Sequence, residues 1–360
     1  MRVALITRST LFTARGGDTI QLLETNSHLR ALGIRSEIIL ADKNPDYNQY
    51  DLLHFFNITR PADILRHIER SPAPYVLSPI WIDYTGYDKF HRTDWTAPFF
   101  KLFPGNNNEY LKTIARGLAG KDIFPGISYL RKGQQKSITA ILKNCSALLT
   151  GSEEEYQVIK KKFGPVQLQK NVPLGIDPLR FKTSDTIPKE KDLVICVARI
   201  EGIKNQLNLI KALNNSAYRL LLIGAAAPNQ SGYYRACKKI AAGNISFIDH
   251  LPQEELLQYY QKAKVHVLPG WYENCGLASL EAAAMKCNIV STKNGFAASY
   301  FGEDALYCDP ASPSSIYNTV DTAAKKETTS LLAEKISSTY TWQKTGKKTA
   351  EAYESILNNK

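Results

Sequence analysis

Apolar segments of β type alternate with amphipathic helical segments along this chain, and the alternation occurs twice. Residues 19–32, for example, have an apolar face that includes Leu22 and Leu29, and Gly33 follows where such a helix should end. Near-continuous apolar strands that alternate with helices form parallel sheets covered on both faces, so the sequence predicts an α/β fold. The expected strands are residues 2–7, 35–40, 51–56, 75–78 and 147–151, and then residues 192–198, 218–224, 245–249 and 265–268.

A chain of 360 residues is longer than one hydrophobic core usually supports. Residues 177–192 separate the two rounds of alternation, and they are polar and contain proline, which is typical of a linker. We therefore expect two Rossmann-like, doubly wound domains with a cleft between them. Ligands of such sheets bind at the carboxyl ends of the strands.

The net charge and the cysteine content indicate which kinds of partner the protein could bind and in which cellular compartment it could occur. A formal net charge of +11 indicates an acidic partner, namely phosphate groups, an anionic bilayer or nucleic acid. No zinc-finger, basic-zipper or RNA-recognition pattern supports nucleic acid. The six cysteines form no Cys-x-x-Cys pair and do not cluster with the six histidines, so we expect reduced core residues and no metal site. No apolar run suits a signal peptide or a membrane span, so we expect a cytoplasmic location.

The most informative segment follows the apolar strand at residues 265–268. It contains Glu273, a helix start near Gly276, and Glu281 eight positions after the first acid. Two carboxylates can hold hydroxyl groups, and the N–H groups of a helix start can hold a diphosphate, so the segment suits a nucleotide-sugar. The alternative is an ordinary strand-loop-helix crossover with both glutamates in solvent.

Two further loops at strand ends suit phosphate. Gly16 and Gly17 precede a helix after the first strand, and Arg199 and Lys204 follow the strand at residues 192–198. Backbone N–H groups, a guanidinium fork and an ammonium group are all common phosphate ligands. A plain turn and two solvated cations are the alternatives. The loop at Gly16 lacks the G-x-G-x-x-G pattern, which argues against a dehydrogenase.

Together these motifs resemble retaining glycosyltransferase family 4, which has the GT-B fold. Residues 270–290 resemble its E-x7-E signature, although Cys287 and Asn288 stand where the family usually has Gly-x-Pro. Residues 198–205 resemble its G-R-x-x-x-x-K-G segment, with alanine and asparagine in place of the two glycines. Residues 172–181 resemble its interdomain strand, and residues 340–342 resemble the start of its terminal helix.

The resemblance implies a GT-B enzyme in which residues 1–176 form the acceptor-side domain and residues 177–338 bind the nucleotide-sugar. Residues 339–360 would cross back to the first domain. The implied catalytic residues are Arg199, Lys204 and Glu273. The implied donor-binding residues are Gly16, Gly17, Gly224, Asn274, Cys275, Gly276, Leu277 and Glu281.

The implied reaction moves a hexose-type sugar from a UDP or GDP donor, with retention of the anomeric configuration. Cations take the place of magnesium in such a site, and the chain contains no Asp-x-Asp triplet, so we expect neither metal nor cofactor. Two alternatives stay open: a nucleotide-sugar 2-epimerase and a non-catalytic GT-B partner subunit.

One departure from the family concerns a histidine after the fourth strand, near the donor sugar. This chain has Trp81 and Asp83 in that region, and both are candidates for lining the acceptor side without a catalytic role. We interpret His54 and His266, which lie in apolar strands, as packed residues.

The acceptor is predicted from residues 84–135, where aromatic residues, such as those in 95–103, mix with many cations. Such a mixture suits a membrane interface, so we hypothesise a glycan or lipid-linked acceptor at the inner face of the membrane, as in surface polysaccharide or lipopolysaccharide synthesis. Packing of these aromatics against the domain is an equal alternative. The cations include Lys89, Arg92, Lys101, Lys112, Arg116, Lys121, Arg131 and Lys132.

Overall fold

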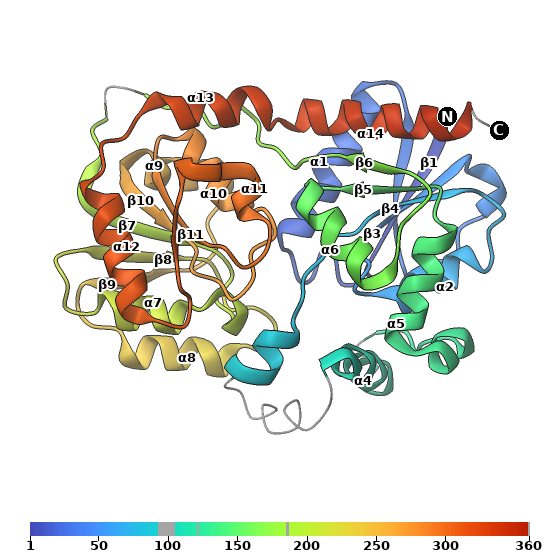
Figure 1. Cartoon of the computed structure of the whole chain (residues 1–360), viewed down its shortest axis with the longest axis horizontal. Coiled ribbons are helices and arrows are strands. Elements are labelled where there is room, and N and C mark those ends of the chain that lie inside the picture. Colours follow the sequence, from blue (N-terminus) through green and yellow to red (C-terminus); the bar gives the residue numbers. More distant parts are fainter. Residues whose placement is uncertain (93–104, 121, 185–186, 359–360) are drawn as a thin grey trace. The chain divides into compact units, whose positions relative to one another are not determined.

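The computed structural model describes residues 1–92, 105–120, 122–184 and 187–358, and the side chains of 105–107 are not among those described. The chain forms two compact units (Figure 1). The first unit consists of Met1–Thr85, Pro98–Leu174 and Trp342–Lys360, and the second consists of Gly86–Ala97 and Gly175–Thr341. Both units therefore contain chain from more than one part of the sequence.

The first unit contains a six-stranded parallel sheet in the order β2-β1-β3-β4-β5-β6. Its strands are β1 (Arg2–Thr7), β2 (Arg35–Leu40), β3 (Leu52–Phe56), β4 (Tyr75–Ser78), β5 (Ala147–Thr150) and β6 (Gln169–Asn171). Its helices are α1 (Gly17–Ala31), α2 (Pro61–Ile68), α4 (Gly105–Leu118), α5 (Ile127–Asn144), α6 (Glu153–Phe163) and α14 (Trp342–Leu357), with the short η1 (Tyr47–Gln49). All the predicted strands of this half are present, but β6 was missed because it is a short, polar edge strand.

The second unit contains a second six-stranded parallel sheet, in the order β12-β11-β10-β7-β8-β9. Its strands are β7 (Glu190–Val197), β8 (Arg219–Ile223), β9 (Ile245–Ile248), β10 (Ala263–Val267), β11 (Asn288–Thr292) and β12 (Leu306–Cys308). Its α-helices are α7 (Gln206–Leu213), α8 (Ser231–Ile240), α9 (Gln253–Lys262), α10 (Leu277–Ala284), α11 (Ala297–Phe301), α12 (Pro313–Lys325) and α13 (Ser330–Thr339). The shorter helices are η2 (Tyr87–His91), η3 (Gly202–Lys204) and η4 (Gly302–Asp304).

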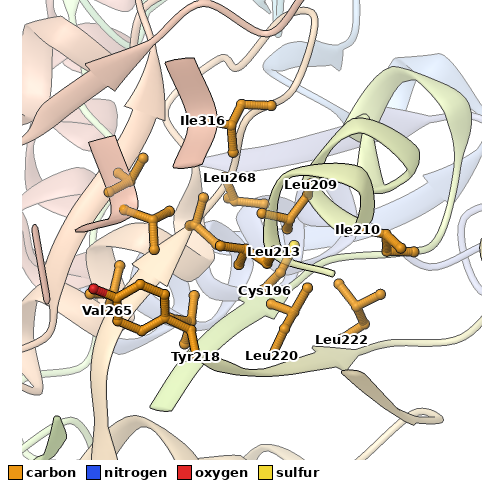
Figure 2. Close-up of a cluster of buried hydrophobic side chains, with 14 of the residues drawn as sticks. Cys196, Leu209, Ile210, Leu213, Tyr218, Leu220, Leu222, Val265, Leu268 and Ile316 are labelled. Carbon is orange, nitrogen blue, oxygen red and sulfur yellow. The ribbon is translucent and has the colours of Figure 1, made fainter. Parts of the chain in front are cut away.

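The core of the second unit lies where α7 and α12 cover the sheet. Figure 2 shows Leu209 and Leu213 of α7 above Cys196, Leu220 and Val265 of the strands. These side chains are fully buried, which fixes α7 and the loop before it against β7. The six cysteines of the chain are buried and free, in agreement with the prediction of reduced core residues.

The C-terminal helix completes the first unit, because α14 packs on α1. Gly346 of α14 lies so close to α1 that a Cβ there would be 2.5 Å from the Cβ of His28. His54 on β3 is fully buried, and its ring nitrogens bond the Tyr353 hydroxyl (2.6 Å) and the Ser78 hydroxyl (2.9 Å). Burial lowers the pKa of His54 to about 3, so the predicted packed histidine is neutral. Within the described residues, no helix has the length and apolar character that crossing a membrane requires.

Candidate active site

The strand order of the second unit brings two of the predicted loops together. Its strands run 3-2-1-4-5-6 when they are numbered from β7, and β7 and β10 are direct neighbours in the sheet. Ligands of such sheets bind beyond the carboxyl ends of the strands, at the point where the order reverses. Arg199 follows β7, and Glu273 follows β10. The candidate site is therefore the edge of the sheet at this reversal.

An ion pair between partly buried Lys204 and buried Glu273 lies in the candidate site. The Nζ atom of Lys204, on η3, is 2.8 Å from Oε2 of Glu273, and the Glu273 side chain is 2% exposed. Burial raises the pKa of the Glu273 carboxyl, and the Lys204 ammonium group opposes this rise. Burial alone would lower the pKa of Lys204, but the Glu273 carboxylate outweighs it and the pKa is raised. Lys204 is therefore a charged group at neutral pH.

The second carboxylate oxygen of Glu273 is different. Oε1 is buried, and it has no hydrogen-bond partner within the part of the chain that the structure describes. It lies against the backbone of Gly270, where a Cβ atom would come within 2.2 Å of it. A buried carboxylate oxygen without a donor is costly, so this atom is a natural acceptor for a ligand hydroxyl.

The backbone of Glu273 is fixed by the loop after β11. Its N–H group donates to the carbonyl of Asn294 (2.9 Å), and its carbonyl accepts from the N–H group of Phe296 (2.8 Å). Between them, Gly295 has a φ of 110°, and a Cβ there would be 2.1 Å from the carbonyl oxygen of Glu273. Sequence reasoning assigned no role to Gly270, although it begins the segment that resembles the family signature, or to Gly295, which lies outside that segment.

The loop that carries the two predicted cations is held by Asn205. This residue has a φ of 60°, and its side-chain amide donates to the carbonyls of Pro269 (2.9 Å) and Pro310 (2.7 Å). Asparagine tolerates the left-handed conformation, so it can replace the second glycine of the family segment. Arg199, 39% exposed at its side chain, donates to Glu201 (3.0 Å). The structure therefore brings Arg199, Lys204 and Glu273 together, each cation with an acidic partner.

Glu281 lies on α10 and is also buried, but it is held by neutral donors. Its Oε2 atom accepts from the Tyr260 hydroxyl (2.9 Å), and its Oε1 atom accepts from the Gln253 amide (3.0 Å). Burial raises the pKa of Glu281 to about 7, and these two hydrogen bonds and Arg180 oppose the rise. The alternative of two solvated glutamates is therefore wrong. Tyr260 and Gln253 lie more than 20 residues before Glu281 and could not be identified from the sequence.

The remaining residues predicted to bind the donor lie at the start of α10, after β8 and at the start of α1. Gly276 begins α10 with a φ of 70°, next to Asn274, Cys275 and Leu277. Gly224 follows β8 and has a φ of 145°. A Cβ there would lie 2.1 Å from the Ala198 carbonyl oxygen, so close packing explains this glycine. The predicted contacts of these residues with a donor stay predictions.

Gly16 and Gly17 belong to the other unit, at the start of α1. The N–H group of Gly16 donates to the Thr19 hydroxyl (3.1 Å), and Arg8 fixes the loop through a bidentate contact with Asp18 (2.6 and 3.0 Å). One N–H group of the predicted phosphate turn is thus already engaged inside the protein.

The chain after β4 contributes to the second unit, which the sequence did not suggest. The hydroxyl of Tyr87 occupies the space above Gly202, where a Cβ would be 1.9 Å away. The ring of His91 stacks on Trp271 at a centroid distance of 3.5 Å and an interplanar angle of 8°. The backbone N–H group of Trp271 in turn donates to the Ile203 carbonyl (2.8 Å). Tyr87 and His91 therefore contact the two loops that carry Lys204 and Glu273.

The other predicted residues are described within their own units. Asp83, in the first unit, accepts from the Thr85 N–H group (2.9 Å) and is 3.4 Å from Lys162. Trp81 is buried beneath the same lysine. His266 is fully buried on β10, and burial lowers its pKa to about 3. Residues 95–103, Lys101 and Lys121 lie outside the described residues.

Among the described residues, no group of three or more His, Cys, Asp or Glu side chains could hold a metal ion. The expectation that the site needs no metal and no cofactor stays a prediction.

Two parallel six-stranded α/β units, with structural neighbours among the GT-B glycosyltransferases, place the chain in the GT-B fold class. Sucrose-phosphate synthase from Thermosynechococcus elongatus aligns with 100% of both chains at a TM-score of 0.74 and 14% identity. HepE from Anabaena, solved in complex with UDP, aligns with 99% of this chain and 100% of its own at a TM-score of 0.68 and 14% identity. Identities at this level show the fold alone.

Residues 179–339 match the model of the family described as glycosyl transferases group 1, and this segment contains the candidate site. The chain is also 26% identical over 227 residues to a glycogen synthase of Mycobacterium tuberculosis (strain CDC 1551 / Oshkosh). That match covers 59% of this chain and 55% of the relative, so the chain spans about half the length of this relative.

Proposed function

We propose that this protein is a retaining glycosyltransferase that moves a hexose-type sugar from a UDP or GDP donor to a glycan or lipid-linked acceptor. The observation that carries the proposal is the ion pair of Lys204 with buried Glu273, beside Arg199, at the point where the strand order reverses in the segment that matches the group 1 family. Relatives give independent support, because HepE from Anabaena has been solved with UDP and with UDP-glucose.

The chemistry proposed for the cations is stabilisation of the leaving group. When the bond between the anomeric carbon and the diphosphate breaks, negative charge grows on the phosphate oxygen and positive charge on the sugar. Lys204 and Arg199 are placed at the sheet edge where this diphosphate would lie, and fixed cations in a dry site favour the charge that develops. On bond cleavage the departing diphosphate oxygen becomes basic, and in a retaining transfer it would take the proton of the acceptor hydroxyl.

The chemistry proposed for the acids is recognition of hydroxyl groups. Oε1 of Glu273 is buried without a donor, so a sugar hydroxyl would supply the hydrogen bond that this atom lacks. Glu281 would hold the ribose hydroxyls of the nucleotide. The two roles fit the different environments of the two carboxylates, one paired with a cation and the other with neutral donors.

The lipid-linked acceptor is proposed from an apolar surface of the first unit. Leu118, Phe124 and Ile127 are 74%, 50% and 69% exposed, and Phe124 packs on Gly117, directly before Leu118. The exposed cations Arg131 and Lys132 follow on α5. Exposed apolar side chains beside cations suit an anionic bilayer face, which would place the protein at the inner side of the membrane in surface polysaccharide synthesis.

Cosedimentation tests this membrane contact. We expect salt-sensitive binding to vesicles that contain anionic phospholipid, weak binding to neutral vesicles, and weaker binding by Leu118→Ser and Ile127→Ser. Leu331→Ser is a matched control, because Leu331 is 71% exposed but lies on α13 of the other unit. Equal pelleting of all four proteins would contradict the proposed surface.

Calorimetric titration with UDP, GDP, ADP and CMP, without metal, tests the donor site. We expect the protein to bind UDP or GDP selectively and Arg199→Ala to bind it more weakly. Binding of none of the four would favour a non-catalytic GT-B subunit. Conversion of a free nucleotide-sugar without an acceptor would identify a 2-epimerase instead.

A further inference from the structure

Lys189 lies directly before β7, at the end of the sheet away from the candidate site, and its ammonium group contacts three residues in two other segments. Nζ donates to the backbone carbonyls of Tyr260 (2.8 Å) and Met285 (2.6 Å). It is also 3.6 Å from the Sγ atom of Cys287. The side chain is partly buried, and burial lowers the pKa of Lys189.

The two carbonyls that Lys189 contacts are at the C-terminal ends of two helices. Tyr260 lies in the last turn of α9, and Met285 is the residue that ends α10. The last carbonyls of a helix lack partners within the helix and carry partial negative charge, so a cation stabilises them. The thiol of Cys287 supports the same end of α9, because Sγ donates to the carbonyls of Tyr260 (3.2 Å) and Ala263 (3.3 Å). A single ammonium group therefore ties the ends of α9 and α10 together.

These are the two helices between which the Glu281 carboxylate is held. Glu281 itself is on α10, while Gln253 and Tyr260, which donate to its two oxygens, are the first residue and a last-turn residue of α9. Tyr260 takes part at both of its ends, because its carbonyl accepts from Lys189 and its hydroxyl donates to Glu281. A shift of α9 relative to α10 would therefore break the hydrogen bonds that place the carboxylate.

We propose that Lys189 is a positioning residue for Glu281, which fixes α9 against α10 so that the carboxylate is held in place to bind the ribose hydroxyls of the donor nucleotide. This inference rests on the proposed function, since it assumes that Glu281 meets the ribose. Lys189 itself does not touch the nucleotide.

The test compares two ligands that differ only at the ribose: the diphosphate nucleotide that the wild-type protein binds, and its 2′,3′-dideoxy analogue. The ratio of the two affinities measures the ribose contact separately from the phosphate contact. We expect Lys189→Met, which keeps most of the length of the side chain and removes the charge, to lower this ratio by about tenfold, as we also expect of Glu281→Gln. Affinity for the dideoxy analogue should stay as in the wild type.

Three matched variants make the result specific. Lys189→Arg keeps a cation at the helix ends and should restore much of the ratio. Lys335→Met removes a lysine that pairs with Asp304 on the surface of the same unit, and it should leave the ratio unchanged. Tyr260→Phe should lower the ratio, and adding Lys189→Met to it should lower the ratio no further, because both changes act through the same hydroxyl.

The outcomes separate this inference from the function on which it rests. If the wild-type protein binds no nucleotide, or does not distinguish the ribose from the dideoxy sugar, the proposed role of Glu281 fails and the inference fails with it. If Glu281→Gln lowers the ratio but Lys189→Met does not, only the inference is overturned. An equal loss of affinity for both ligands in Lys189→Met would overturn it as well, because such a loss indicates general damage to the fold. If Lys189→Met does not fold, Lys189→Arg can be combined with Tyr260→Phe instead. Additive effects of these two changes on the affinity ratio would overturn the inference.

Discussion

Two buried glutamates, one in each unit, differ in the partners of their carboxylate oxygens. Glu155 of α6 is 2% exposed, and its two oxygens accept from the backbone N–H groups of Trp81 (2.8 Å) and Gly151 (2.7 Å). Glu273 is equally buried, but one of its oxygens contacts a lysine and the other has no donor among the described residues.

The difference separates a structural carboxylate from one that is ready for a ligand. Glu155 joins the loop after β4 to the loop after β5 and uses both oxygens to do so. Glu273 keeps an oxygen that accepts no hydrogen bond from the described residues, and its position is fixed by Gly270, Asn294 and Phe296. Burial alone therefore does not identify a candidate functional acid, and the hydrogen bonds of each carboxylate oxygen have to be considered as well.

Replacement of Glu273 should have the largest effect on activity. We expect Glu273→Gln to lower kcat/KM by about 100-fold or more, because an amide cannot balance Lys204 or bind a hydroxyl in the same way. Steady-state kinetics with the donor identified by titration measures this effect. A similar loss in Glu155→Gln would remove the distinction between the two acids.

Replacement of Glu155 should instead have the largest effect on stability. Glu155→Ala removes the carboxylate that accepts from the N–H groups of Trp81, which is buried, and Gly151, which is partly buried, so the free energy of unfolding should fall by about 3 kcal/mol. Denaturant unfolding measures the loss. Calorimetry on the folded variant should give wild-type nucleotide affinity, and a selective loss of binding without a loss of stability would contradict our interpretation of Glu155.

The fixed position of the Glu273 carboxylate can be tested through Gly270. Gly270→Ala should push Oε1 from its place, since the new Cβ would lie 2.2 Å from it, and we expect kcat/KM to fall by about 30-fold. Gly232→Ala is the matched control, because a Cβ at Gly232 meets nothing within 4 Å. Equal activity of the two variants would mean that the carboxylate tolerates displacement.

Glu281 lies in a third kind of environment, and we expect it to have a smaller, pH-dependent effect on nucleotide affinity. Because burial raises its pKa to about 7, Glu281 is mostly protonated at pH 6 and mostly ionised at pH 8. If the ionised form binds the ribose, nucleotide affinity should rise by about tenfold over this interval. Glu281→Gln should lack this part of the pH dependence, and identical pH profiles would rule out ionisation of Glu281 as its cause.

The raised pKa of Glu281 has the opposite effect on stability: without nucleotide, the folded protein should become less stable as the pH rises. The folded state binds the Glu281 proton more tightly than the unfolded state does, so this contribution to stability is present below pH 4.5 and is lost as the pH rises through about 7. The difference between wild type and Glu281→Gln in thermal unfolding at pH 5 and pH 8 isolates it.

The sequence predicted those parts of the molecule that depend on local pattern. The bounds of β1, β2 and β4 agree with the predicted strands. Almost every residue of β1 and β4 is buried, whereas β2 is an edge strand that mixes buried and exposed residues. The strands β6 and β12 have three residues each, and β6 is polar, so no local pattern could reveal β6. Asn205 was recognised as a replacement for glycine, but its bonds to Pro269 and Pro310 arise only when the chain is folded.

In the candidate site, too, the residues that belong to local motifs were predicted, whereas the contacts between distant residues were not. Arg199, Lys204 and Glu273 were identified from motifs, and the structure brings them to the reversal point of one sheet. That Lys204 pairs with Glu273, 69 residues away, was not predicted. Nor were the supports of Glu281, because Tyr260, Gln253 and Lys189 are ordinary residues whose importance comes from distant contacts.

The contact between His54 and Tyr353 has a consequence for the synthesis of the protein. The two residues are separated by 299 positions, and α14 covers α1 and supplies the hydroxyl that the buried imidazole bonds. A chain emerging from the ribosome therefore presents the first unit without its closing helix until residues 342–357 have been made. The second unit can form earlier than the first one finishes, although domains generally fold in the order of their translation.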